Sequence, residues 1–296
     1  MEKIKRNKHR WWKILLIILS VLILLSGAEL LYSNYAITAS RYSVSSEKVT
    51  GSFRIVFLSD LHGREFGSGN SRLLTKISAE EPDLIVMAGD IIDSGDGEVE
   101  VAAVCAFIRS ASIIAPVYFS LGNHETVLIT DRIPDLEKRL SAAGAVVLDN
   151  RYLDLTVNGT ELRLGGYTGY YRIPHLDTQD SQEQAELVAF ADDFENTDRF
   201  KLLLNHLPII WLDWGYRNKF PVDLVLSGHY HGGVVRIPIL EQGIYAPYVG
   251  FFPPYTKGLF AGKEATCILT TGLAGSYGLP RFFNPPEIVV VDVTAS

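Results

Sequence analysis

The sequence predicts an α/β protein that carries a hydrophobic helix near its N-terminus. Short apolar, β-rich runs alternate along the chain with longer segments of helical periodicity, and one continuous apolar stretch, Ile14–Tyr32, precedes them all. The 296 residues are 47% hydrophobic and 21% charged, which excludes an intrinsically disordered chain. Only 2 cysteines are present, which excludes a disulfide-built scaffold.

The stretch Ile14–Tyr32 is long enough to cross a membrane, since as a helix it extends for roughly 28 Å. A basic flank over 1–13 and the pair Trp11-Trp12 precede it, as at a cytoplasmic interface. The positive-inside rule then places the rest of the chain outside the cytoplasm, as a single-pass membrane protein. Two interpretations remain open: a retained anchor over 14–32, or a signal peptide cleaved near Ser26 and Ala28.

The chain beyond this helix is acidic. The whole sequence has a net charge of −7 although its first residues are strongly basic. An acidic body lacks the positive stripe that binding to a nucleic acid backbone needs, so we expect no nucleic acid partner. We expect a monomer. Cys105 and Cys267 could pair outside the cytoplasm, but two separate buried thiols are the simpler expectation.

A linker rich in Ser and Thr is expected over 33–52, with an edge strand around Ala39–Val44 where apolar and polar residues partly alternate. One domain is expected over 53–296. Its strands are predicted from short apolar runs bounded by Asp, Gly or Asn. These runs are Phe53–Leu58, Leu84–Ala88, Val117–Leu121, Lys201–Leu204 and Val222–Leu226.

Helical patterns occupy the intervals between these strands, at Ser71–Ala79, Glu98–Arg109, Asp131–Ala143 and Gln182–Phe194. Runs that are apolar throughout are typical of strands covered on both faces. The pair Asn158-Gly159 between two alternating runs instead predicts an antiparallel hairpin. The sheets are therefore expected to be mixed.

Polar segments whose side chains could bind metal or take part in catalysis follow directly after these five strands. They read SDLHG from Ser59, GDIID from Gly89, GNHE from Gly122, NHLP from Asn205 and SGHYHGG from Ser227. Five of the 7 histidines fall within them. Because open α/β sheets gather their sites at the carboxyl ends of strands, we expect these side chains to converge.

Seven of these side chains are candidate metal ligands: Asp60, His62, Asp90, Asn123, His206, His229 and His231. Imidazole together with carboxylate suits Zn, Mn, Fe or Co better than Mg or Ca. Seven ligands exceed the need of one tetrahedral ion. Two divalent metal ions that share a carboxylate are therefore the simplest arrangement.

The five segments in this order resemble the signature of the calcineurin-like metallophosphoesterase superfamily, over roughly 53–233. The region after it, with Thr270–Gly275 and Arg281–Pro286, further resembles the membrane-anchored bacterial branch, which includes phosphodiesterases and pyrophosphatases acting on UDP-diacylglucosamine. The resemblance implies a four-layer α/β/β/α sandwich. It also implies a first metal at Asp60, His62 and His231, a second at Asn123, His206 and His229, and Asp90 between the two.

The same resemblance gives His124 a catalytic role away from the metals, where it stabilises charge on phosphate or protonates the leaving oxygen. Asp93 either orients His124 through a carboxylate–imidazole hydrogen bond or caps its own loop. The sequence departs from the family pattern GHTHGGQ at Tyr230 and Val234. Neither change removes a ligand, but both bear on which leaving group fits.

The resemblance implies a hydrolase that cleaves a phosphodiester or pyrophosphate bond, in a lipid or cell-envelope substrate, by attack of a metal-activated hydroxide. A phosphomonoesterase or phosphoprotein phosphatase is one alternative. A metal-binding envelope protein without turnover is another.

Two further features remain open at the level of sequence. The segment Gly243–Phe260 is dense in aromatic residues, and it either packs as a long loop or forms an apolar surface that meets the membrane or an acyl chain. Arg172, Arg236 and Arg281 are candidate contacts for phosphate or a headgroup. His175 lies outside every motif and is expected at the surface.

Overall fold

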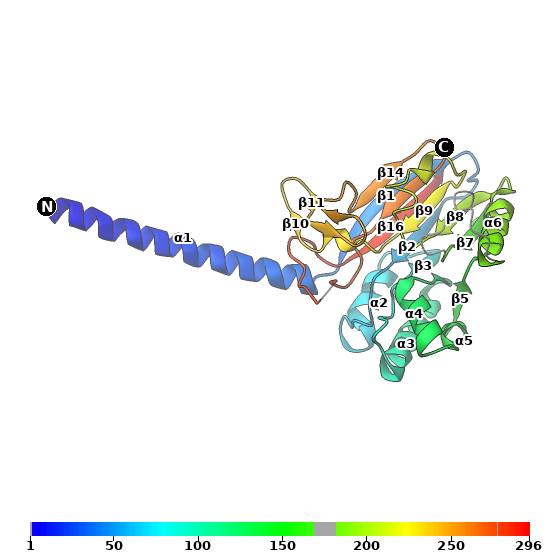
Figure 1. Ribbon diagram of the computed structural model, residues 1–296, viewed down its shortest axis with the longest axis horizontal. Helices are drawn as coiled ribbons and strands as arrows, with labels where there is room; N and C mark the ends of the chain where they lie inside the picture. Colours follow the sequence, from blue (N-terminus) through cyan, green and yellow to red (C-terminus); the bar gives the residue numbers. More distant parts are fainter. Residues whose placement is uncertain (1, 169–181, 277) are drawn as a thin grey trace.

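The computed structural model describes residues 2–168, 182–276 and 278–296. The body consists of two face-to-face sheets with helices outside them (Figure 1). One sheet is covered by α2 (Ser71–Ser78), α3 (Glu98–Ile114) and α5 (Leu136–Ala142), and the other by α6 (Gln182–Glu195). The predicted four-layer α/β/β/α arrangement is therefore confirmed.

The first sheet has the order β1-β16-β2-β3-β4-β5. Strands β2 to β5 run parallel, β16 is antiparallel to β2, and β1 is parallel to β16. In this order the strands are Thr38–Ser46, Glu287–Ala295, Phe53–Leu58, Leu84–Ala88, Val117–Ser120 and Ala145–Leu148.

The second sheet has the order β14-β15-β9-β8-β7-β6. Its four central strands are parallel, and its two edge strands are antiparallel to their neighbours, so both sheets are mixed as expected. In this order the strands are Gly258–Ala261, Thr266–Leu269, Leu224–Ser227, Phe200–Leu204, Thr160–Gly166 and Arg151–Val157.

Strand β2 shows why its sequence is apolar at almost every position. Ile55 and Phe57 point into the core between the two sheets, whereas Val56 and Leu58 pack against the outer helices. All four side chains are fully buried. Successive side chains of a strand point to opposite faces, so a strand covered on both faces shows no alternation with polar residues. Cys105 and Cys267 are buried free thiols in different clusters, as expected.

The helix predicted over Asp131–Ala143 is present but begins later than expected. Helix α4 (Asn123–Asp131) ends where this helix was expected to begin, and α5 starts only at Leu136. Pro134 lies in the gap, and the residue before a proline is restricted away from helical geometry. Strand β9 also starts two residues later than predicted, after Pro221.

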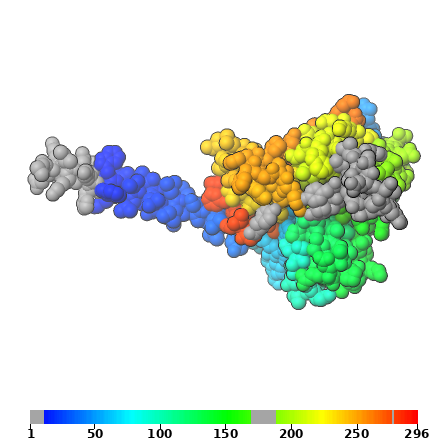
Figure 2. Space-filling model, in the orientation of Figure 1, coloured from blue at the N-terminus to red at the C-terminus, as the bar shows by residue number. Residues whose placement is uncertain are grey.

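Helix α1 (Glu2–Tyr35) stands away from the body (Figures 1 and 2). Its part Trp11–Tyr35 is 25 residues long, with a mean hydropathy of 2.7 in its most apolar window, and could be a membrane anchor or a signal sequence. The segment 33–52, expected as a linker with an edge strand, contains the end of α1 and the nine-residue strand β1. Pairing with β16 along its whole length joins β1 to the body.

Four two-residue strands lie in the loops between β9 and β14. Strand β10 (Arg236–Ile237) pairs with β11 (Gln242–Gly243), and β12 (Tyr245–Ala246) pairs with β13 (Gly250–Phe251). In Figure 1 the β10-β11 hairpin lies at the end of the body from which α1 leaves.

The two-sheet core predicts a contrast between two isoleucines. We expect Ile55→Ala to lower the free energy of unfolding by about 2–5 kcal/mol, because it leaves a cavity between the sheets. Ile113→Ala is the matched control, since that side chain is 86% exposed on α3. Urea denaturation of the two variants measures the difference, and equal losses would contradict the placement of this core.

Candidate metal centre

All nine residues predicted for the site come together at one edge of the two sheets. Seven of them line a cavity of about 420 Å³, together with Tyr248 and part of the loop 275–278. The other two, Asp60 and His206, are buried directly behind it. The loops that carry them follow β2, β3 and β4 of the first sheet and β8 and β9 of the second. The predicted convergence at strand ends is what the structure shows.

The candidate ligands lie in unusual backbone conformations. Five of them have positive φ angles: Asp60 (54°), His62 (47°), Asp90 (53°), His229 (69°) and His231 (47°). A side chain other than glycine in this region costs free energy, and such residues cluster at functional sites. The neighbouring turns need glycine because of close approach: a Cβ on Gly228 would lie 2.4 Å from Asp60 Oδ2, and one on Gly122 would lie 2.3 Å from Asp90 Oδ1.

Three histidines are oriented by hydrogen bonds from their Nδ1 atoms. His206 donates to the carbonyl of Ala88 over 2.8 Å, and His231 donates to the carbonyl of Ala274 over 3.3 Å. His62 Nδ1 lies 3.1 Å from Asp93 Oδ2. An acceptor at Nδ1 fixes the tautomer, so the Nε2 atom of each ring presents a lone pair to the centre.

Carboxylate oxygens and another imidazole nitrogen lie close to these Nε2 atoms, so positive charge, from a proton or a metal ion, is needed between them. His206 Nε2 lies 2.9 Å from Asp90 Oδ2 and 3.2 Å from His229 Nδ1. His231 Nε2 lies 3.5 Å from Asp60 Oδ1. Acceptors packed against acceptors repel each other unless a cation lies among them. The residues present therefore fit a metal site.

Among the described residues, three groups of three have ligand atoms within 4.8 Å of one another: Asp60, His62 and His231; Asp90, His206 and His229; and His62, Asp93 and His124. In addition, His62 Nε2 and Asn123 Oδ1 are buried without a hydrogen-bond partner in the described chain. Leaving a buried polar atom unpaired costs about 1–3 kcal/mol, which coordination to a cation would offset. Both atoms belong to the predicted ligand set.

The electrostatics of the centre favour cation binding. Burial would raise the pKa of Asp60 and Asp90, but the neighbouring histidines outweigh it and lower both. Burial lowers the pKa of His229 to about 3 and that of His231 to about 4, which keeps these rings neutral. Burial would also lower the pKa of His206, but Asp90 raises it to about 10. The pair formed by His206 and Asp90 thus attracts positive charge.

His124 differs from the other histidines in its tautomer. Its Nδ1 accepts a hydrogen bond from the backbone N–H of Ser94 over 2.9 Å, so the neutral ring carries its proton on Nε2. That atom lies 3.8 Å from Asp90 Oδ2 and the ring lines the cavity. His124 therefore presents a donor where the other rings present acceptors.

Asp93 does not form the expected hydrogen bond with His124, because the Ser94 N–H occupies that Nδ1. Its Oδ1 lies 3.6 Å from His124 Nδ1, while its Oδ2 bonds to His62. The bond from His62 lowers the pKa of Asp93 to about 2. Oδ1 also accepts the N–H of Gly95 over 2.8 Å. Asp93 thus orients a candidate ligand and also caps its own loop.

Glu125 joins two of the ligand loops. Its fully buried carboxylate accepts four backbone N–H groups, those of Asp90 (2.8 Å), Ile91 (2.8 Å), Ile92 (2.9 Å) and Gly122 (2.8 Å). Glu125 is not among the residues predicted for the site. The available signal was its position three residues after Gly122, where a capping glutamate is expected.

Residues 53–233 match the family model described as calcineurin-like phosphoesterase. The chain belongs to this family. The uncharacterised metallophosphoesterase YkuE of Bacillus subtilis is 29% identical over 248 residues, which cover 80% of this chain and 78% of that protein. The phosphodiesterase YaeI of Escherichia coli is 26% identical over 243 residues, which cover 81% and 82%.

Among solved structures, a dimetal phosphatase from Danio rerio is similar to this chain with a TM-score of 0.41 and 14% sequence identity. The match covers 75% of this chain and 88% of that one. Membership in the calcineurin-like family makes the chain a phosphoesterase, and members of this family use a dinuclear metal centre.

Part of the aromatic segment 243–260 packs as a folded loop, and part of it is an exposed apolar surface, so each of the two expected arrangements describes part of it. Tyr255 and Phe260 pack edge to face with ring centroids 5.0 Å apart, as in a folded loop. Phe251 and Phe252 are 74% and 61% exposed. Tyr248 lines the phosphoesterase cavity and stacks on His229, with centroids 5.2 Å apart and an angle of 9° between the rings. It thereby covers one candidate ligand.

Two of the candidate phosphate-binding arginines have structural roles instead. Arg281 is fully buried and donates to the carbonyls of Ala274 and Thr271. Arg236 donates to the carbonyl of Gly232 and to Thr256 Oγ1. Sequence alone does not reveal that these guanidinium groups already donate to backbone carbonyl groups. Arg172 and His175 lie outside the described residues.

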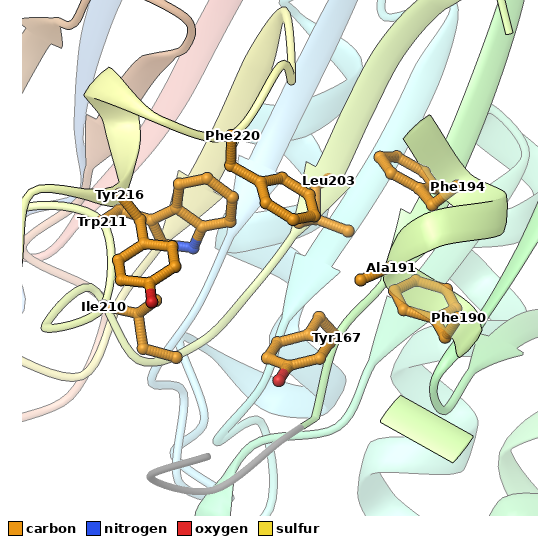
Figure 3. A pocket seen from close by; sticks show the side chains of 9 residues that line it. All are labelled: Tyr167, Phe190, Ala191, Phe194, Leu203, Ile210, Trp211, Tyr216 and Phe220. Atoms are coloured by element: carbon orange, nitrogen blue, oxygen red, sulfur yellow. The ribbon is translucent and has the colours of Figure 1, made fainter. Parts of the chain in front are cut away.

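A separate cavity lies between the second sheet and α6 (Figure 3). It is lined by aromatic and aliphatic side chains, among them Phe190, Trp211 and Phe220. Its volume of about 20 Å³ is close to the minimum for one water molecule. It is a packing gap of the apolar layer and contains none of the nine predicted site residues.

The contacts of Glu125 predict a loss of order in the ligand loops when it is changed. We expect Glu125→Gln to reduce stability by about 1–3 kcal/mol, because the amide would turn a donor toward backbone N–H groups. The metal affinity should fall as well. Glu100→Gln is the matched control, since Glu100 is exposed and its carboxylate accepts the N–H of Gly97 at the start of α3. Thermal unfolding and Mn²⁺ titration measure both effects, and similar behaviour of the two variants would contradict this role.

Proposed function

We propose that this phosphoesterase hydrolyses a phosphodiester or pyrophosphate bond at a centre of two divalent metal ions. The observation that carries the proposal is the set of acceptor atoms around Asp90, of which His206 Nε2 at 2.9 Å is the closest. Imidazole with carboxylate favours Zn, Mn, Fe or Co. The similarity to a phosphodiesterase supports a diester as substrate.

The ligands divide into two sets around a shared carboxylate. We assign Asp60, His62 and His231 to the first ion and His206, His229 and Asn123 to the second, with Asp90 between them. The grouping of ligand atoms within 4.8 Å supports this division. Bound there, the two ions would supply a water activated near neutral pH and positive charge that offsets the charge developing on phosphate.

His124 is assigned the role of proton donor. Its Nε2–H faces the cavity because the Ser94 N–H occupies Nδ1. From there it can donate to a phosphate oxygen or to the leaving oxygen. Asp93 is assigned an indirect role, in which it holds His62 in the orientation that a ligand needs.

The substrate is assigned to the membrane or cell envelope. The apolar segment Trp11–Tyr35 supports a retained anchor that keeps the domain at a bilayer surface. The basic residues before it support a catalytic domain on the extracytoplasmic side, with a cytoplasmic flank over 1–13 and an anchor over 14–32. A lipid is the phosphodiester that this location would provide.

Metal dependence tests the proposal directly. Protein stripped with a chelator should lose hydrolysis of bis(p-nitrophenyl) phosphate and regain it with Mn²⁺ or Zn²⁺. Asp90→Asn should lower the rate by at least about a thousandfold, because both ions lose their shared ligand. Asp131→Asn, at the exposed end of α4, is the control. Activity indifferent to the chelator and to Asp90→Asn would reject the metal mechanism, and faster hydrolysis of p-nitrophenyl phosphate would favour a phosphomonoesterase.

The role of His124 predicts a dependence on the leaving group. We expect His124→Gln to slow an alkyl diester by roughly 10²–10⁴-fold, because an alkoxide needs protonation as it departs. A p-nitrophenyl diester, whose leaving group departs as a stable anion, should be slowed much less. Comparison of kcat for the two substrates measures the difference, and equal slowing would show that His124 does not protonate the leaving oxygen.

A further inference from the structure

A second groove lies beside the metal centre. This groove, here called the α1 groove, has a volume of about 600 Å³. His62, Gly275 and Gly278 line both the α1 groove and the metal cavity, so the two adjoin at these residues. Its other side is formed by the last two turns of α1, including Leu30 and Leu31.

The end of α1 is held against the body by specific hydrogen bonds. Asn34 Nδ2 donates to the carbonyl of Arg281 over 2.9 Å, and the Arg281 N–H donates back to Asn34 Oδ1 over 3.1 Å. The N–H of Asn284 donates to Ser33 Oγ, and that of Phe283 donates to Glu29 Oε1, each over 3.1 Å. These bonds make α1 a defined wall of the groove.

The groove lies where α1 would leave a bilayer. The apolar segment Trp11–Tyr35 has 25 residues, or roughly 37 Å of helix, which exceeds the ~30 Å hydrocarbon core. With Trp11 at one interface, Tyr35 and Leu31 lie at the other. Figure 2 shows that the helix leaves the body at this end. The turn of the β10-β11 hairpin, at the same end, exposes 93% of Ile239.

The lining of the groove combines apolar surface with one cation. Leu30, Leu31 and Leu279 provide the apolar surface, and Leu279 is 57% exposed. Arg64 is half-buried, and burial lowers its pKa. Its guanidinium donates to the carbonyl of Asn34 and lies 4.8 Å from the Phe66 ring centroid.

No carboxylate within the described residues forms an ion pair with Arg64. A partly buried guanidinium without a carboxylate favours binding of an anion, above all of phosphate, which its planar donors match. The groove therefore combines an anion site with an apolar site next to the metal centre.

We propose that the α1 groove binds an anionic, phosphate-linked membrane lipid as the substrate of the metal centre. The acyl chains lie along Leu30, Leu31 and Leu279, Arg64 contacts the anionic headgroup, and the scissile phosphate lies past His62. Hydrolysis breaks one P–O bond, with the hydroxyl of water added to phosphorus and its proton to the leaving oxygen. This inference rests on the proposed hydrolase function and names its substrate class, and α1 becomes part of the binding site.

Lipid binding tests the inference independently of turnover. The probe is pyrene-labelled phosphatidylglycerol, titrated by fluorescence against the full chain in dodecyl maltoside micelles. Arg64→Gln and Leu279→Glu should each weaken binding by about tenfold or more, because the first removes the cation and the second places a charge on the apolar wall. Arg64→Lys should recover most of the affinity, since it keeps the charge.

Two matched controls separate binding from helix docking and from surface charge. Arg72 also donates to the last turn of α1, to the carbonyl of Tyr35 over 2.9 Å, but does not line the groove. Arg72→Gln should therefore leave the affinity unchanged. Ile113→Glu adds the same charge as Leu279→Glu on the exposed face of α3, and it should also have no effect. Equal thermal midpoints among the variants establish that the fold is intact.

Several outcomes would overturn the inference. If Arg64→Gln and Leu279→Glu both bind the lipid with wild-type affinity, the groove is not the binding site. An equal loss of lipid affinity in Arg72→Gln would show that Arg64 holds α1 against the body and does not bind the lipid. If deacylated glycerophosphoglycerol competes as well as the intact lipid, the apolar wall does not contribute, and the occupant is a soluble phosphodiester rather than a lipid.

The same experiment separates this inference from the proposed function. Hydrolysis of bis(p-nitrophenyl) phosphate without selective lipid binding would leave the metal hydrolase intact and reject the α1 groove. Selective lipid binding without hydrolysis of any diester by Mn²⁺-loaded protein would support the groove and reject the hydrolase. With both in place, Leu279→Glu should lower the ratio of lipid to p-nitrophenyl diester turnover by about tenfold.

Discussion

The site depends on the burial of carboxylate and imidazole groups whose ligand atoms face one another and need positive charge between them. His206 Nε2 lies within hydrogen-bond distance of both His229 Nδ1 and Asp90 Oδ2, and the Nδ1–H of His206 is already donated to a backbone carbonyl. Such an arrangement is unfavourable unless positive charge lies among the atoms. The backbone around them is also strained, since five of the candidate ligands have positive φ angles.

The two sheets offset the free-energy cost of this arrangement. Parallel strands of both sheets end at one edge, and their apolar side chains fill the core between them, so the ligand loops are short and fixed at both ends. Glu125 adds a direct link, because one carboxylate holds the Asp90 loop and the Gly122 turn together. The large apolar core thus supplies the stability that the polar centre lacks.

As the proposed membrane anchor, helix α1 would connect this centre to a bilayer surface. Its last turn is bonded to the segment 281–284, and that segment follows the loop whose Gly275 and Gly278 line both the metal cavity and the α1 groove. A helix that only tethered the domain would not need this set of bonds. The proposed lipid site follows from the position of the helix end, and a soluble form of the domain without α1 would lack one wall of it.

The sequence by itself determined the fold class, the family and the set of candidate ligand residues, because each candidate follows directly after a strand and strand ends converge in α/β sheets. Only the tertiary structure decided the hydrogen-bond partners. The N–H of Ser94 donates to His124 Nδ1, and Asp93 bonds to His62 instead. The guanidinium of Arg281 donates to backbone carbonyl groups. The pairing of β1 with β16 joins segments about 250 residues apart, and the α1 groove joins residues 30–35 to 274–280. Contacts between such distant segments depend on the packing of the whole chain, which no local pattern encodes.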